Sequence, residues 1–122
     1  MAKKYDLQER LVNFAVAVIR LAEKFPKTYS GIHLAGQVTR SGSAPALNYG
    51  EAQSAESRND FIHKMKIALK EIRETNCCFR IVAKLKWVEE NDIASVLSEC
   101  DELAAIFATS IKTATTNKRS PG

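Results

Sequence analysis

Apolar residues recur at three- or four-residue intervals along most of the chain. The first run comprises Leu7, Leu11, Phe14, Val18, Leu21 and Phe25. This spacing places the side chains on one face of an α-helix. Asp6 precedes the run, and a carboxylate favours a helix N-terminus, whereas Pro26 disfavours helical geometry at the residue before it. The pattern predicts a first helix from about residue 6 to residue 25.

A second apolar set on this helix, Val12, Val16 and Ile19, lies beyond that face. The expected apolar stripe of a helix packed in one small domain covers about three or four positions in two turns. The additional apolar surface needs a cover, so we expect the protein to associate with copies of itself.

The second segment, from Ile32 to about Ala55, carries four residues of low helix propensity. They are Gly36, Gly42, Pro45 and Gly50. Its apolar positions still fit one helical face, and a proline inside a helix bends it. We therefore predict a helix that is kinked near Pro45.

Two longer helices complete the prediction. Ser57 is a suitable N-cap with Asp60 three residues later, and periodic apolar positions then continue to about Trp87. A fourth run extends from Asp92 to Ile111. The fold class is therefore all-α, an antiparallel up-and-down four-helix bundle over residues 1–112, and residues 113–122 are predicted to be a disordered polar tail.

Composition restricts the class of protein further. Of the 122 residues, 45% are hydrophobic and 26% are charged, a balance typical of one folded domain. No apolar stretch approaches the roughly 20 residues of a membrane span, and the start lacks the pattern of a secretory signal. We expect a cytoplasmic protein without membrane partners, whose three cysteines are reduced thiols, with Cys100 in the core.

Catalytic and metal-binding patterns are missing from the sequence. A dimetal bundle needs two Glu-x-x-His motifs, whereas the nearest match is the single run Asp60-Phe61-Ile62-His63. No Ser-His-Asp arrangement or glycine-rich phosphate loop can be assembled. We expect no enzyme activity, no metal and no cofactor.

Charge separates the last two helices. Residues 55–88 contain eight Lys or Arg and four Asp or Glu, whereas residues 89–111 contain six acidic residues and no basic one. The candidate nucleic-acid-binding residues are Lys64, Lys66, Lys70, Arg73, Arg80, Lys84 and Lys86. Such a row can track phosphates, but it can equally pair with the acidic helix beside it. Both interpretations remain open at this point.

Several polar residues fall near predicted core-facing positions, where a buried charge needs a partner. These candidates for a structural polar network are Arg40, Asn48, Glu51, Glu71 and Glu74.

Three motifs carry a family resemblance: Arg40-Ser41, Asn48-Tyr49-Gly50-Glu51-Ala52 and Asp60-Phe61-Ile62-His63-Lys64. With them the chain resembles the four-helix-bundle family named for open reading frames in intervening sequences of bacterial 23S rRNA genes. The resemblance implies a ring-like homo-oligomer, a pentamer, and supplies no catalytic residues. A related branch comprises accessory variability proteins of diversity-generating retroelements, whose basic barrels bind a reverse transcriptase and nucleic acid.

Taken together, these features predict a non-enzymatic homo-oligomer that acts as a nucleic-acid-associated accessory factor. RNA, DNA and a reverse transcriptase or other protein are candidate partners. The alternative is a protein-interaction scaffold that binds no nucleic acid.

Overall fold

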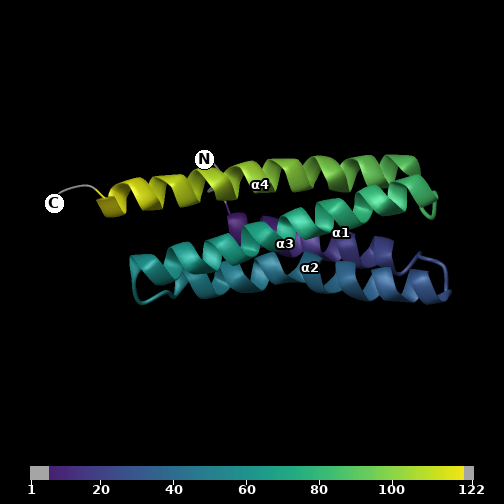
Figure 1. The fold of residues 1–122 in the computed structure, drawn as a ribbon, viewed down its shortest axis with the longest axis horizontal. Helices are drawn as coiled ribbons and strands as arrows, with labels where there is room; N and C mark the ends of the chain where they lie inside the picture. The colour runs from purple at the N-terminus through teal and green to yellow at the C-terminus, as the bar shows by residue number, and fades with distance from the viewer. Residues whose placement is uncertain (1–5, 120–122) are drawn as a thin grey trace, which may run out of the picture.

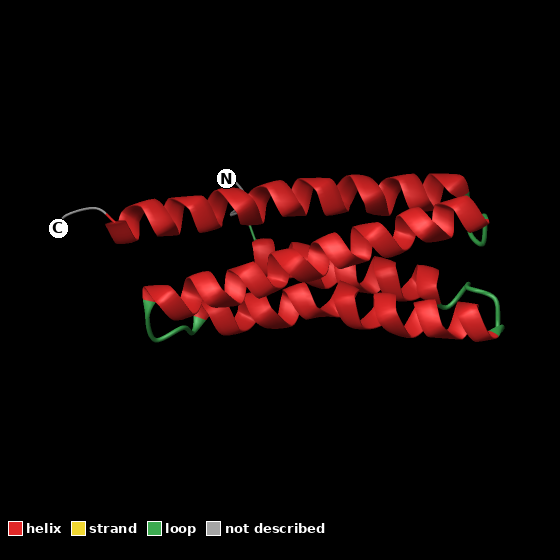
Figure 2. Cartoon of the chain, in the orientation of Figure 1, coloured by secondary structure: helices red, strands yellow, loops and turns green. Residues whose placement is uncertain are grey.

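The structure, a computed structural model, describes residues 6–119 and contains four helices in that range. They are α1 (Leu7–Ala22), α2 (Tyr29–Gln53), α3 (Arg58–Leu85) and α4 (Glu90–Arg119). Within the described range every regular element is a helix and none is a strand (Figure 2). The predicted all-α class and the four predicted helices are confirmed.

Side-chain caps explain where three of the helices begin. Asp6 accepts a hydrogen bond of 3.0 Å from the backbone N–H of Glu9, and Ser57 accepts one of 3.0 Å from that of Asp60. Thr28 caps α2 in the same way, so this helix begins at Tyr29 and not at Ile32 as predicted. A hydroxyl or carboxylate at this position satisfies an N–H that has no partner inside the helix.

The ends of α3 and α4 differ from the prediction. α3 stops at Leu85 because Lys86 adopts a left-handed backbone conformation, with φ 59°. α4 begins at Glu90 and continues to Arg119, through most of the segment predicted to be a disordered tail. Its last turns lie beside the start of α3, where Arg58 and Phe61 share a hollow with Ala114. The predicted tail at residues 120–122 lies outside the described residues.

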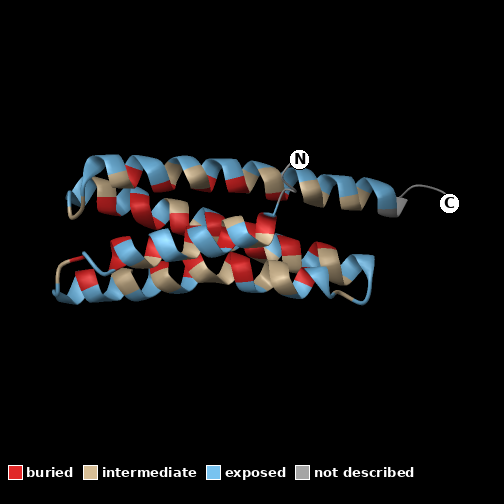
Figure 3. Ribbon diagram, turned by 180° about the vertical axis from the view of Figure 1, so that it is seen from behind, coloured by how far each residue is buried: buried red, intermediate tan, exposed pale blue. Residues whose placement is uncertain are grey.

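Helices that are consecutive in the chain pack side by side, whereas α1 and α4 approach each other over a much shorter stretch (Figure 1). Buried residues lie on all four helices (Figure 3). The largest include Leu11, Ile72, Phe79, Leu103 and Phe107, each at 0% exposure. One apolar core therefore holds the four helices together.

A close contact between α1 and α2 depends on a glycine. A Cβ atom at Gly42 would lie 2.5 Å from Cγ1 of Val18, so no larger residue fits there without movement. Pro45 follows within the same helix, which runs without a break from Tyr29 to Gln53. Among the described helices, none is both long and apolar enough to cross a membrane.

Candidate nucleic-acid interface

Five of the seven predicted nucleic-acid-binding residues lie along one side of α3. The positions are i, i+4, i+7, i+14 and i+18, which share a helix face. These residues are all exposed, and we call them the basic face: Lys66, Lys70, Arg73, Arg80 and Lys84. The face spans 18 residues, about 27 Å of helix.

The other two predicted residues lie elsewhere. Lys64 points towards α2 and donates a hydrogen bond of 2.6 Å to Glu51, which raises the pKa of the ammonium group. Lys86 lies past the end of α3, in the turn towards α4. Neither extends the basic face.

A hollow of about 470 Å³ lies between α3 and α4 at one end of the basic face. It is lined by Lys66, Lys70 and Arg73 from α3 together with Lys112 from α4. Leu69, Ala108 and Ile111 line the rest of it, and no acidic side chain contributes to this lining. We call this feature the basic hollow; its four cations create a local positive potential that attracts anions.

The cations of the basic hollow form no ion pair among the described residues. Two acidic residues of α4, Glu99 and Glu102, are directed to α1 instead. Arg10 binds Glu99 through two hydrogen bonds of 2.7 Å and Glu102 through one of 2.9 Å. The described ion pairs thus join α4 to α1 or to the turn after it, and α2 to α3, and none joins α3 to α4.

Further along the face, a carboxylate reduces the positive charge. A second hollow of about 310 Å³ contains Arg73, Arg80, Asn76 and Asp101. Asn76 donates a hydrogen bond of 3.4 Å to Asp101, so this carboxylate shares the second hollow with Arg73 and Arg80. Of these two hollows, only the basic hollow has no acidic residue in its lining.

The predicted polar-network residues separate into three groups. Arg40 donates hydrogen bonds to Glu71, Glu74 and Gln37, and its hydrogen bond to Glu71 is the main cause of a raised pKa. Glu51 pairs with Lys64. Asn48 donates a hydrogen bond of 3.0 Å to the carbonyl of Ala44 within its own helix. The structure thus brings Arg40, Glu71 and Glu74 together, at the surface between α2 and α3.

The residues chosen from the sequence as site candidates do not include a buried hydroxyl pair and one basic residue of the hollow. The hydroxyl oxygens of Ser41 and Thr75, two fully buried residues, lie 2.8 Å apart between α2 and α3. Their position opposite each other depends on helix register, which single-helix patterns do not give. Lys112 lines the basic hollow from α4, and the face of α4 that lies beside α3 is likewise not given by the pattern of one helix.

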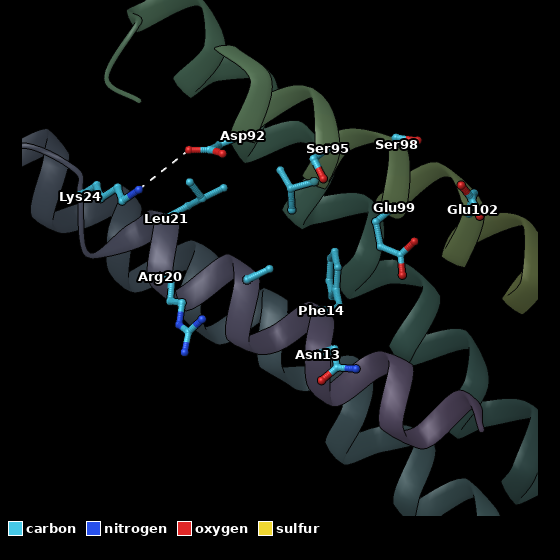
Figure 4. Close-up of a pocket in the computed structure, with 12 residues that line it drawn as sticks. Asn13, Phe14, Arg20, Leu21, Lys24, Asp92, Ser95, Ser98, Glu99 and Glu102 are labelled. Atoms are coloured by element: carbon cyan, nitrogen blue, oxygen red, sulfur yellow. Dashed lines mark ion pairs between the residues drawn. The ribbon is translucent and has the colours of Figure 1, made fainter. Parts of the chain in front are cut away.

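Another hollow, of about 610 Å³, lies between α1 and α4 (Figure 4). These two helices pack against each other less extensively than the other neighbouring pairs do. Phe14 and Leu21 from α1 face Ser95, Ser98 and the acidic residues of α4 across it. Lys24 spans one end to Asp92 at 3.8 Å. Its lining mixes both signs of charge, so it favours no particular ligand.

Among the described residues no cluster of His, Cys, Asp and Glu could hold a metal ion.

The cysteines occupy two environments. Cys100 is buried in the core as predicted, and burial raises the pKa of its thiol to about 12. Cys78 is also buried, and this burial is the main reason why the pKa of its thiol rises to about 11. Cys77 is exposed on the same helix. The raised pKa values of Cys78 and Cys100 make these two thiols poor nucleophiles.

Comparison with known proteins agrees with this architecture. A solved structure of a protein of unknown function from the S23 ribosomal protein family, from Bacteroides thetaiotaomicron VPI-5482, aligns with a TM-score of 0.81 and 27% identity. The alignment covers 88% of this chain and 99% of the other. No curated protein matches the chain. The model of the 23S rRNA-intervening sequence protein family matches residues 3–109, and the chain therefore belongs to that family.

Proposed function

We propose that this protein is a non-enzymatic, homo-oligomeric helical bundle that binds nucleic acid as an accessory factor in the cytoplasm. The observation that carries the proposal is the basic hollow, where four cations surround one depression and none has an acidic partner among the described residues. Phosphate groups are the anions that such a row of Lys and Arg neutralises. Nothing in the arrangement supports chemistry on the bound strand.

The ion pairs distinguish this proposal from the alternative. A scaffold whose basic helix is neutralised by the acidic helix beside it requires ion pairs between α3 and α4. Three acidic side chains of α4 pair elsewhere instead: Glu99 and Glu102 with Arg10 of α1, and Asp92 with Lys24 in the turn after α1. The family description, which refers to an rRNA intervening sequence, agrees with RNA as the nucleic acid.

A salt titration tests the proposal. Binding of fluorescein-labelled RNA and DNA is measured by fluorescence anisotropy at several salt concentrations. We expect affinity to fall steeply with salt, because released counterions drive the association. Replacing Lys66, Lys70 and Arg73 together by Glu should abolish binding.

The matched control carries the same change of charge away from the basic face. Arg20, Lys24 and Lys27 are exposed and lie on α1 or just after it, and their joint replacement by Glu should weaken binding far less. Absence of binding at low salt would contradict the proposal and favour the scaffold alternative. Equal loss in the two triple variants would contradict the assignment of binding to the basic hollow.

Self-association is the second part of the proposal. Val12 and Val16 on α1 are 40% and 41% exposed, and Leu47 on α2 is 67% exposed. Gln8 of α1 donates a hydrogen bond to the carbonyl of Ala46, which brings the first half of α1 beside the second half of α2. An exposed apolar surface shared by two helices is typical of an interface. We propose that the four helices run up and down as an antiparallel bundle, with α2 bent at Pro45, and that copies assemble through this surface into a ring, a pentamer.

Light scattering coupled to gel filtration tests the oligomer. The wild-type protein should elute as a multiple of 13.5 kDa, and five copies are expected. Replacement of Val12 and Val16 by Glu should give monomers, whereas Asn13→Glu, on another face of α1, should not. A wild-type mass of 13.5 kDa at micromolar concentrations would show that the association does not occur.

The proposal also includes a protein partner. A reverse transcriptase or another nucleic-acid enzyme fits the role of an accessory factor. Co-purification of the tagged protein from its native cells, with and without nuclease treatment, separates direct protein contacts from those bridged by nucleic acid.

A further inference from the structure

The basic hollow has a property that phosphate binding alone does not require. Its four cations, which we call the rim, share the hollow with three aliphatic residues, which we call the floor: Leu69, Ala108 and Ile111. Leu69 is 8% exposed and is anchored in the core, while Ala108 is exposed and Ile111 is half-buried. Water over such a floor is readily displaced by a flat apolar surface.

A nucleic-acid duplex and a single strand present different surfaces to this site. A duplex stacks its bases inside and offers a continuous ridge of phosphates, which would contact the rim and leave the floor empty. A single strand can turn an unstacked base towards the protein while its phosphates remain on the cations. Only the single strand uses both the rim and the floor.

The side chains around the floor fit this division of roles. Arg73 has a planar guanidinium that stacks on bases as well as binding phosphate, whereas Lys66, Lys70 and Lys112 act as point charges. No aromatic side chain lines the basic hollow. Stacking therefore falls to Arg73 and the aliphatic floor, which accept any base, so little sequence preference is expected.

On this basis, and resting on the proposed function, we infer that the basic hollow seats an unpaired nucleotide and that the protein binds single-stranded nucleic acid in preference to duplex. Lys112 of α4 takes part in this site, which is shared by two helices.

The experiment compares a labelled single-stranded RNA with the same strand annealed to its complement, by fluorescence anisotropy in low salt. The single strand should bind more tightly by about twofold to thirtyfold, the contribution of one base stacked on a guanidinium. Lys112→Gln should weaken both ligands and reduce the salt slope by about one.

A neutral variant isolates the floor from the charges. Ala108→Leu places a bulkier side chain in the hollow without a change of charge, and Ala94→Leu makes the same change at an exposed position of α4 outside it. Ala108→Leu should remove most of the preference for the single strand and leave duplex binding and its salt slope unchanged. Ala94→Leu should behave as the wild type.

The outcomes separate this inference from the proposed function. If neither ligand binds, both are overturned. If the duplex binds as tightly as the single strand, or if Ala108→Leu and Ala94→Leu behave alike, the protein is a nucleic-acid-binding protein but the hollow does not seat a base.

Discussion

Thr75 on α3 and Ser41 on α2 place their hydroxyl oxygens 2.8 Å apart, and neither side chain is exposed to solvent. Thr75 Oγ1 also lies 2.9 Å from the carbonyl of Glu71, and Ser41 Oγ lies 3.5 Å from that of Val38. The pair thus joins two helices by a polar contact inside an otherwise apolar layer, where a hydroxyl without a partner is costly.

This contact predicts a non-additive response to mutation. Thr75→Val keeps the shape of the side chain but leaves Ser41 with a poor partner, and it should lower the free energy of unfolding by about 1–3 kcal/mol. Ser41→Ala combined with Thr75→Val should cost less than the sum of the single changes. Urea unfolding of the four proteins gives the coupling, and strict additivity would argue against the contact.

Two of the four glycines of α2, Gly36 and Gly42, predict opposite effects of alanine. At Gly42 a new methyl group collides with Val18, so Gly42→Ala should destabilise the fold by about 1–3 kcal/mol despite its better helix propensity. At Gly36 nothing lies within 4 Å of the added atom, so Gly36→Ala should stabilise by about 0.5–1 kcal/mol.

Thermal unfolding of both glycine variants checks the prediction. A Val18→Ala background provides the control, because a smaller side chain makes room and should reduce the cost of Gly42→Ala. Equal responses at the two glycines would show that α1 and α2 are not in such close contact.

The cysteines predict a difference in thiol reactivity. Cys77 is exposed, whereas Cys78 and Cys100 are buried. At pH 8 a disulfide reagent should modify one thiol quickly and the other two only as fast as the fold opens. Cys77→Ser should abolish the fast phase, and persistence of that phase in the variant would place an accessible thiol elsewhere.

The same burial predicts a loss of stability at alkaline pH. The pKa values of Cys78 and Cys100 rise from 9.0 to about 11 and about 12, so the folded chain holds these protons more tightly than the unfolded chain. Their contribution is complete below pH 9 and decreases as the pH rises towards those values. Urea unfolding at pH 8 and pH 10.5 should show a steeper fall for wild type than for Cys100→Ala.

The extent of α4 can be tested with a glycine scan. Ala114 lies in the helix near its end, and Ala114→Gly should lower the free energy of unfolding by about 0.5–1 kcal/mol. Ala105→Gly, in the middle of the same helix, gives the reference value. If residue 114 belonged to a disordered tail, Ala114→Gly would have no effect on urea unfolding while Ala105→Gly still did.

Local signals in the sequence determined most of the secondary structure. Apolar spacing and the caps Asp6 and Ser57 located α1 and the start of α3, because a helix face and an N-cap are properties of a few neighbouring residues. The end of α4 was missed because Ala114 and Thr115 carry little apolar signal; both are half-buried. In the structure this part of α4 is helical and lies beside the beginning of α3, which is far away in the chain.

The basic residues illustrate the same division. The sequence alone determined that α3 is basic and α4 acidic, but it left open whether these charges neutralise one another. Only the tertiary structure decided that Glu99 and Glu102 turn to Arg10 while Lys66, Lys70 and Arg73 meet Lys112 around an apolar floor. The physical reason is that helix periodicity fixes which residues share a face, whereas the rotation and register of one helix against another are set by packing of the whole core.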